Sequence, residues 1–85
     1  MRFTISLTPI SEQHLAAAWL ASLDRPAVAA AAHEMELLLA ADPLRVGESR
    51  ASSVSRTWFI PPIGFTFDVV VDDAAVFVTA IWLTS

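Results

Sequence analysis

The feature that most constrains this 85-residue chain is a change of pattern near Asp42-Pro43. Before this point, after a short opening strand, apolar residues recur at helical spacing. After it, β-branched and aromatic residues predominate. Pro43 also stops a helix, because the residue before a proline is pushed out of helical geometry. The sequence therefore predicts an α+β fold with its helices first and most of its strands last.

The first 24 residues predict a strand followed by a helix. Phe3, Ile5 and Leu7 alternate with polar residues, which is the period of a half-buried strand, and Pro9 ends this pattern. Ser11 offers an N-cap for the helix. The apolar residues of this helix recur at helical spacing: Leu15, Trp19, Leu20 and Leu23.

A second helix is predicted over residues 26–41. Asp24 can cap it, and Pro26 is tolerated in a first turn because its missing N–H would be unpaired there. One side of the helix is apolar: Val28, Ala32, Met35, Leu38 and Leu39. The alanine run at residues 29–32 suits close approach of two helices, and the short link predicts an antiparallel helical hairpin.

Three antiparallel strands are predicted after a loop at residues 44–51. Their ranges follow from β-branched and aromatic runs bounded by turn residues: 54–60, 65–71 and 76–83. Pro61-Pro62 forms the first turn and Asp72-Asp73 the second. We therefore expect a single domain over residues 1–85, in which the helical hairpin packs on a small antiparallel sheet.

The last of these strands is apolar on both faces. Simple alternation puts Val76, Val78, Ala80 and Trp82 on one face, and Phe77, Ile81 and Leu83 on the other. A sheet covered on one side by a helical hairpin does not need a second apolar face. We therefore expect the second face to bind a partner or a second copy of the chain, through the following residues: Phe77, Ile81, Leu83 and Val70.

Composition limits the kinds of partner. The chain is 55% hydrophobic and 16% charged, which excludes a disordered protein. Nine acidic residues face five arginines, there is no lysine, and the net charge of −4 argues against general affinity for phosphate backbones. No apolar run is long enough to span a membrane, and the N-terminal residues fit a secretory signal poorly. We therefore expect a cytoplasmic protein.

Two stretches of sequence carry a resemblance to a known family. They read LLLAADPLRVGESR, at residues 37–50, and RTWFIPPIGFTFDVVVDD, at residues 56–73. In this order of elements they resemble the RelE/ParE family of bacterial toxin–antitoxin systems. The residues that carry the resemblance are Asp42, Pro43, Gly47, Glu48, Arg50, Arg56, Pro61, Pro62, Ile63, Phe67 and Val69. The resemblance implies the order β-α-α-β-β-β.

The resemblance also implies a function. Members of the family cut mRNA in the ribosomal A site or poison DNA gyrase, take part in plasmid stabilisation, and are neutralised by an antitoxin that wraps the toxin with a helix or strand. The ribonuclease branch depends on lysines, arginines and a tyrosine, whereas this sequence has no lysine and no tyrosine. The candidate catalytic residues, for phosphate contact only, are Arg56, Arg50 and Arg45.

The other polar residues offer little chemistry. His14 and His33 are 19 residues apart without a second ligand at helical spacing, so we expect them to have surface or hairpin-packing roles, and we expect no metal or cofactor. Trp19, Trp58 and Trp82 are interpreted as core or interface anchors. A serine nucleophile is not predicted, because the serines near residue 50 have no neighbouring histidine.

The leading hypothesis is a toxin-like component of a toxin–antitoxin pair that acts through protein binding and not as an enzyme. Two alternatives stay open: a non-toxic interaction or homodimerisation domain on the same scaffold, and an active ribosome-dependent endoribonuclease that uses the arginines. The partners to expect are a cognate antitoxin or a second copy of the chain as a homo-oligomer. The expected targets are gyrase or ribosome-bound mRNA.

Overall fold

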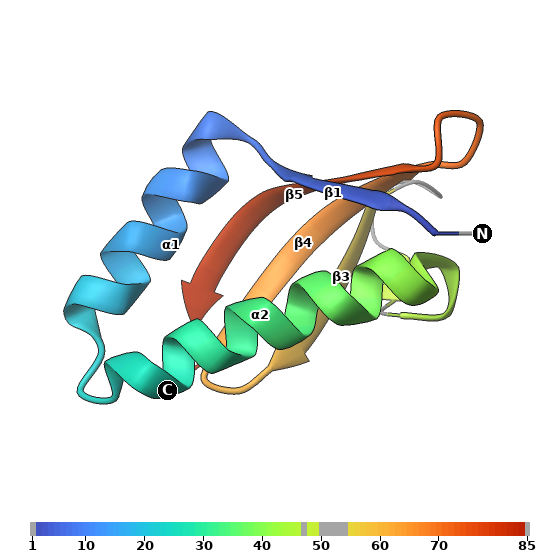
Figure 1. Ribbon diagram of the computed structural model, residues 1–85. Coiled ribbons are helices and arrows are strands. Elements are labelled where there is room, and N and C mark those ends of the chain that lie inside the picture. Colours follow the sequence, from blue (N-terminus) through green and yellow to red (C-terminus); the bar gives the residue numbers. More distant parts are fainter. Residues whose placement is uncertain (1, 47, 50–54, 85) are drawn as a thin grey trace.

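The computed structural model describes residues 2–46, 48–49 and 55–84. The elements follow in this order: β1 (Thr4–Leu7), α1 (Pro9–Ala21), α2 (Arg25–Ala41), the 3-10 turn η1 (Pro43–Arg45), β2 (Glu48–Ser49), β3 (Ser55–Ile60), β4 (Ile63–Val70) and β5 (Ala75–Leu83). The predicted order β-α-α-β-β-β is confirmed (Figure 1). The short strand β2 lies within the segment that was predicted to be a loop.

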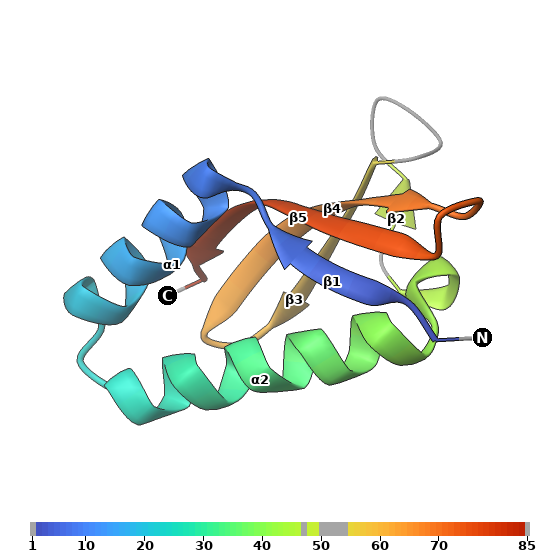
Figure 2. The same cartoon turned by 45° about the horizontal axis from the view of Figure 1, so that its top comes forward.

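The strands form one five-stranded sheet in the order β1-β5-β4-β3-β2. The predicted antiparallel arrangement of the last three strands is confirmed. The first strand adds a feature that the sequence pattern did not predict, since β1 pairs with β5 in parallel. Figure 2 shows β1 lying beside β5, with α2 crossing one face of the sheet.

The core lies between α2 and the sheet. Val28, Met35 and Leu39 of α2 are fully buried, as are Phe65 and Phe67 of β4. The two phenylalanine rings contact each other, with centroids 5.8 Å apart. Both sets face inward because their spacing matches the period of their element, near 3.6 in the helix and 2 in the strand. The predicted inner face of this helix is therefore confirmed at Val28, Met35 and Leu39, whereas Leu38 is 37% exposed.

The N-terminal ends of the two helices test the two capping predictions. Asp24 caps α2, since its Oδ1 accepts a hydrogen bond from Ala27 N at 3.2 Å. The prediction that Ser11 caps α1 is wrong. Thr8 is the cap, and its hydroxyl accepts from Ser11 N at 3.2 Å. Pro9 takes the first helical position, where a proline is favoured. Ser11 is thereby free to bond elsewhere.

The apolar residues of α1 are much more exposed than their helical spacing suggests. Leu20 is 62% exposed, whereas Ala18 and Ser11 are the buried residues of this helix. Leu23, which was predicted to belong to the helix, lies beyond its end at Ala21 and is fully exposed. Leu15 is half-buried against the core. Within the described part of the chain, neither α1 nor α2 is long and apolar enough to cross a membrane.

The last strand contains a β-bulge at Thr79. Phe67 pairs with Val78 while Thr66 pairs with Ala80, so Thr79 is an extra residue in β5. Its hydroxyl donates to Thr66 O at 3.2 Å. Because side chains alternate between faces, one extra residue reverses the side of everything after it.

The bulge overturns the predicted faces of β5. Ile81 is only 4% exposed and Leu83 is half-buried, and both pack against the core together with Val76 and Val78. Trp82 instead lies with Phe77 on the face away from the helices. The prediction that Phe77, Ile81 and Leu83 share one face is therefore wrong, and so is the grouping of Ala80 and Trp82 with Val76 and Val78.

Deletion of Thr79 tests this bulge. Without the extra residue, Val78 and Ala80 become neighbours, and simple alternation keeps Ile81 and Leu83 facing the core opposite the same β4 residues. The deletion then removes the hydrogen bond from the Thr79 hydroxyl, worth about 0.5–1.5 kcal/mol, and leaves the core in place. We expect the deletion variant to unfold at a urea concentration close to that of Thr79→Ala, which loses the same hydroxyl. A much lower midpoint for the deletion variant would contradict this assignment of the extra residue.

Candidate protein-binding groove

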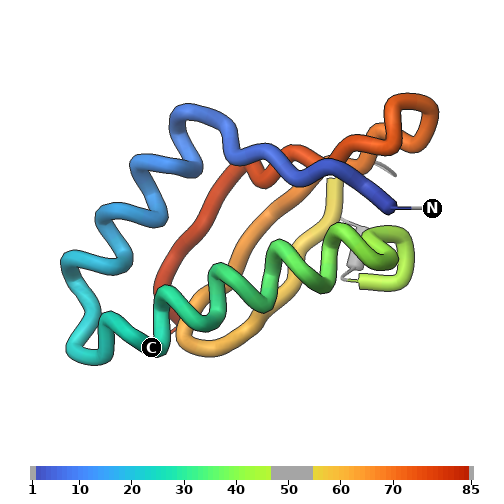
Figure 3. Tube along the Cα trace, viewed as in Figure 1, coloured from blue at the N-terminus to red at the C-terminus, as the bar shows by residue number. Residues whose placement is uncertain are grey.

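The two helices diverge from the short link between Ala21 and Arg25 instead of packing side by side (Figures 1 and 3). In Figure 3, α1 runs along one end of the sheet and α2 runs across its face, so that the pair forms a V. The expected close approach through the alanine run at residues 29–32 is not what the structure shows. Ala31 is buried on the sheet side, whereas Ala29 and Ala32 face the space between the helices.

The position of α1 is set by the edge of β5. The strand β1 pairs with β5 only as far as Val78, because β1 ends at Leu7. From there the edge is bonded by the start of α1. Val78 O accepts from Thr8 N at 3.1 Å and from the Ser11 hydroxyl at 2.6 Å. Such bonds matter because an unpaired backbone group in a buried position is costly.

His14 continues this contact one turn further along α1. Its Nδ1 accepts a hydrogen bond from Ile81 N at 3.3 Å. His14 is half-buried and bonds to β5, so it packs against the sheet and not within the helical hairpin that the sequence suggested. Ser11 and His14 together hold α1 against β5 at positions 67 residues away in the sequence.

The second helix is held by different parts of the molecule. Its buried side chains rest on the sheet, and near its end Ala40 O accepts from Phe3 N at 2.9 Å. Asp42 ends it, with its N–H donating to Leu38 O at 3.2 Å. Because α1 is held by the edge of β5 and α2 by the face of the sheet, the two helices need little contact with each other.

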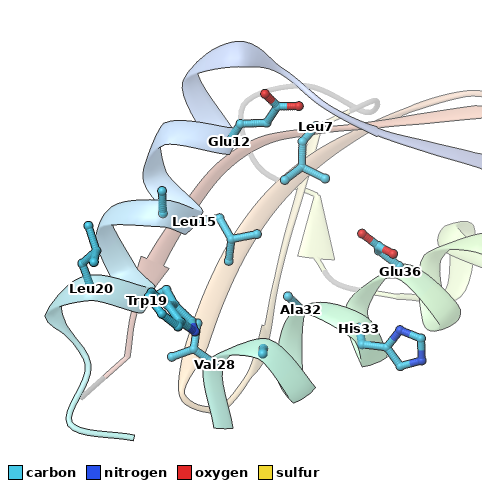
Figure 4. Close-up of a pocket in the computed structure, with 11 residues that line it drawn as sticks. Leu7, Glu12, Leu15, Trp19, Leu20, Val28, Ala32, His33 and Glu36 are labelled. Carbon is cyan, nitrogen blue, oxygen red and sulfur yellow. The ribbon is translucent and has the colours of Figure 1, made fainter. Parts of the chain in front are cut away.

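The space between the helices is an open apolar groove of about 710 Å³ (Figure 4). We use the word groove for the surface formed by these eleven residues: Leu7, Glu12, Leu15, Ala16, Trp19, Leu20, Val28, Ala29, Ala32, His33 and Glu36. Large apolar side chains come from α1, while α2 presents alanines opposite them. Small residues facing large ones leave the hollow unfilled.

The polar residues of the groove are not evenly distributed. Glu12 lies on α1 and Glu36 on α2, one on each wall, and His33 lies beside Glu36. Near the link between the helices, the Arg25 guanidinium stacks over the Trp19 ring at 4.8 Å and donates to Leu20 O at 3.3 Å. Negative charge therefore lies toward the open end of the V, while at its closed end Arg25 stands next to the Asp24 carboxylate.

A second hollow, of about 610 Å³, lies on the side of the sheet away from the helices. We call it the outer hollow; its lining residues are Thr8, Asp68, Val69, Val70, Val71, Asp72, Phe77 and Thr79. Two of the predicted partner-binding residues, Phe77 and Val70, are exposed here. The other two, Ile81 and Leu83, lie on the opposite side of the sheet, facing the core.

An aromatic row crosses the same outer side of the sheet at its other end. Phe59, Gly64 and Trp82 are register partners on β3, β4 and β5. The rings of Phe59 and Trp82 meet edge to face, with centroids 6.2 Å apart. A Cβ at Gly64 would lie 2.6 Å from the Trp82 ring, so the indole lies directly over this glycine. Trp82 therefore lies on the outer side of the sheet and not in the core, and its role as an interface anchor stays a prediction.

The candidate phosphate-contacting arginines are in different surroundings. Arg45 lies in η1, is 87% exposed, and pairs with Asp42 at 3.2 Å. Arg56 is the second residue of β3 and lies on the core side, opposite Phe67, and its Nε is buried without a hydrogen-bond partner among the described residues. Arg50 lies outside the described residues. Its role in a phosphate site is therefore a prediction from the sequence.

Sequence reasoning did not identify the groove. It took Trp19 as a core or interface anchor, and Trp19 does line the groove. The available signal was the difference in size between the facing residues, with leucine and tryptophan at positions 15, 19 and 20 and alanines at positions 29 and 32. Periodicity finds the apolar side of each helix, but it does not show what covers that side.

With this geometry described, the fold can be compared with known structures. The chain has the fold of RelE/ParE toxins of bacterial toxin–antitoxin systems. It is similar to a chain of the RelBE2 toxin–antitoxin complex from Mycobacterium tuberculosis, with a TM-score of 0.79 and 16% identity over 98% of this chain and 99% of that one.

Two other solved structures share the fold. A chain of the chromosomal ParDE system from P. aeruginosa has a TM-score of 0.73 and 13% identity, over 99% of this chain and 98% of that one. A free double mutant of the E. coli toxin RelE has a TM-score of 0.70 and 12% identity, over 100% and 86%. No family model matches the sequence, and no curated protein is significantly similar to it.

Removal of the Ser11 hydroxyl tests what positions α1. Ser11 is fully buried and its hydroxyl bonds to Val78 O, so we expect Ser11→Ala to lower the free energy of unfolding by about 1–2 kcal/mol. Urea denaturation measures this loss. Ser6→Ala, at an exposed position of β1, is the matched control and should change stability by less than about 0.5 kcal/mol. Equal effects of the two variants would show that the Ser11 contact does not hold the helix.

Proposed function

We propose that this protein is the toxin-like component of a toxin–antitoxin pair and that it acts by binding protein. The observation that supports this most is the groove, an open apolar surface between two helices on a RelE/ParE fold. Two structures that share this fold come from two-component toxin–antitoxin systems, RelBE2 and ParDE. The expected partner is accordingly an antitoxin.

The exposed residues of the groove suit protein binding. Trp19 and Leu20 are 41% and 62% exposed, and tryptophan is among the residues that most often dominate binding energy at interfaces. Contiguous exposed apolar surface of this kind usually marks an interaction site in a protein this small. Of the targets that the resemblance implies, gyrase therefore fits better than ribosome-bound mRNA. We place the pair in the cytoplasm, where gyrase acts.

Charge argues against RNA as the substrate. Cleavage through a 2′-hydroxyl needs acid–base groups and cations arranged around a phosphate that gains charge. The charged residues that line the two hollows are carboxylates instead, Glu12 and Glu36 in the groove and Asp68 and Asp72 in the outer hollow. Arg45 is bound to a carboxylate of its own. Carboxylates repel a phosphate backbone.

Growth on induced expression tests the toxin-like role. We expect expression of the chain alone to arrest growth of a bacterial host, and co-expression of the protein encoded by the adjoining reading frame to restore it. Purification of the two proteins together should give a stable complex. Normal growth in spite of soluble, folded protein would contradict toxicity and favour the non-toxic interaction domain.

Leu20→Ser tests whether the groove carries the partner contact. A buried leucine contributes about 1.5–3 kcal/mol, so its loss should weaken partner binding by roughly 10- to 100-fold. Leu20 is already exposed in the free chain, so stability should change little. Leu23→Ser, at a fully exposed position outside the groove, is the matched control and should bind normally. Calorimetric titration measures both, and equal affinities would place the contact elsewhere.

Arg56→Ala tests the ribonuclease alternative. Because we propose protein binding, we expect induced wild-type chain to leave transcript 5′ ends unchanged, and we expect Arg56→Ala to arrest growth as the wild type does. Thermal unfolding of the variant controls for loss of structure, since this side chain is partly buried. New transcript ends that depend on Arg56 would instead establish RNA cleavage.

A further inference from the structure

We propose that the groove binds an amphipathic helix whose flanking side chains, next to its apolar stripe, are basic. This inference rests on the proposed function, because it specifies the chemistry of the partner that occupies the same groove. It is carried by two observations: the walls of the groove are helices, and the charges at its open end are carboxylates.

The helical walls of the groove favour a helix over a strand as its occupant. Apart from Leu7, the lining residues come from α1 and α2, five from each. The backbone groups of a helix interior are already bonded within the helix, so these walls offer no ladder to an added strand. A strand lying between them would leave its own N–H and C=O groups unpaired against apolar side chains, which is costly. A helix bonds its own backbone and presents only side chains.

The apolar residues fix which side of the occupant faces inward. Leu15, Trp19 and Leu20 line one wall and Val28 lies deep on the other, while alanines at 29 and 32 leave room between them (Figure 4). A row of large apolar side chains on the partner helix, at positions i, i+3, i+4 and i+7, would fill this room. The alanines of α2 would let such a helix approach closely.

The carboxylates at the edges of the groove indicate the charge of the flanking residues on the partner helix. Glu12 and Glu36 stand on opposite walls and both are exposed, and no lysine or arginine is among the groove residues. Basic residues on both flanks of the docked helix would each meet a carboxylate, whereas acidic flanks would be repelled from both sides. Such rim charges select the partner and speed association more than they add affinity. The net charge of −4 acts in the same direction at longer range.

The charges differ along the groove. Arg25 and the neighbouring Asp24 stand at the closed end and offset each other, while Glu12 and Glu36 stand toward the open end. The basic residues should therefore be concentrated in the part of the partner helix that lies at the open end. A basic residue at the closed end would find no net negative charge.

A defined peptide library tests the proposal. The probes are helical peptides of 18 residues with a fixed leucine stripe and with lysine, glutamine or glutamate varied at the flanking positions, displayed and sorted against the wild-type chain. We expect lysine to be enriched on both flanks in one half of the peptide. The best lysine peptide, made synthetically and labelled, then serves to measure Kd by fluorescence polarisation.

Matched variants locate the charge effect. The double variant Glu12→Gln/Glu36→Gln should bind the lysine peptide at least roughly fivefold more weakly at low salt, with a smaller salt dependence. Glu34→Gln, an exposed carboxylate of α2 outside the groove, is the control and should bind as the wild type does. Glu12→Lys/Glu36→Lys should reverse the preference and select the glutamate peptides.

Three results would overturn the proposal: enrichment of glutamate or glutamine flanks, equal binding of the lysine peptide to the double glutamine variant, or no enrichment at all. These outcomes are separate from failure of the proposed function. Growth arrest with rescue by a partner whose helix is acidic would keep the toxin-like role and remove the inference. Normal growth together with lysine-selective peptides would remove toxicity and keep the inference.

Discussion

The contact on which the rest of the structure depends is the one between the start of α1 and the edge of β5. After Val78 the edge loses its strand partner, and the Ser11 hydroxyl and the His14 imidazole provide the bonds that a strand would have made. A helix attached in this way stands at the end of the sheet and cannot also lie along α2. The divergence of the helices, and the groove between them, follow from how this edge is bonded.

The bulge at Thr79 lies next to this contact and has a matching effect on the side chains. The extra residue turns Ile81 and Leu83 toward the core, on the end of the sheet that α1 covers, and it turns Trp82 outward over Gly64. The change of edge partner and the change of face therefore occur within two residues of each other. One short segment of β5 determines both the inner packing of the sheet and the aromatic row on its outer side.

These two features explain what the sequence could and could not predict. The elements, the Asp24 cap and the inner side of α2 depend on local period and capping, which can be read from the sequence. Ser11 was misassigned because its partner, Val78, is 67 residues away. Ile81 was misassigned because alternation assumes an unbroken strand. The groove was missed because periodicity shows that α1 has an apolar side but does not show whether another element covers that side. The prediction for Arg50 is not tested, since this residue lies outside the described residues.

The positions of the charged residues say more about possible partners than the net charge does. An acidic chain without lysine argues at first only against nucleic acid. In the structure the carboxylates flank both hollows, while Arg45 is paired with Asp42 and Arg25 closes the end of the groove. A scaffold can thus lose the cations that phosphate chemistry needs and still keep an apolar surface between its helices, because the two depend on different residues. In the complex that we propose, the carboxylates select the charge of the protein partner.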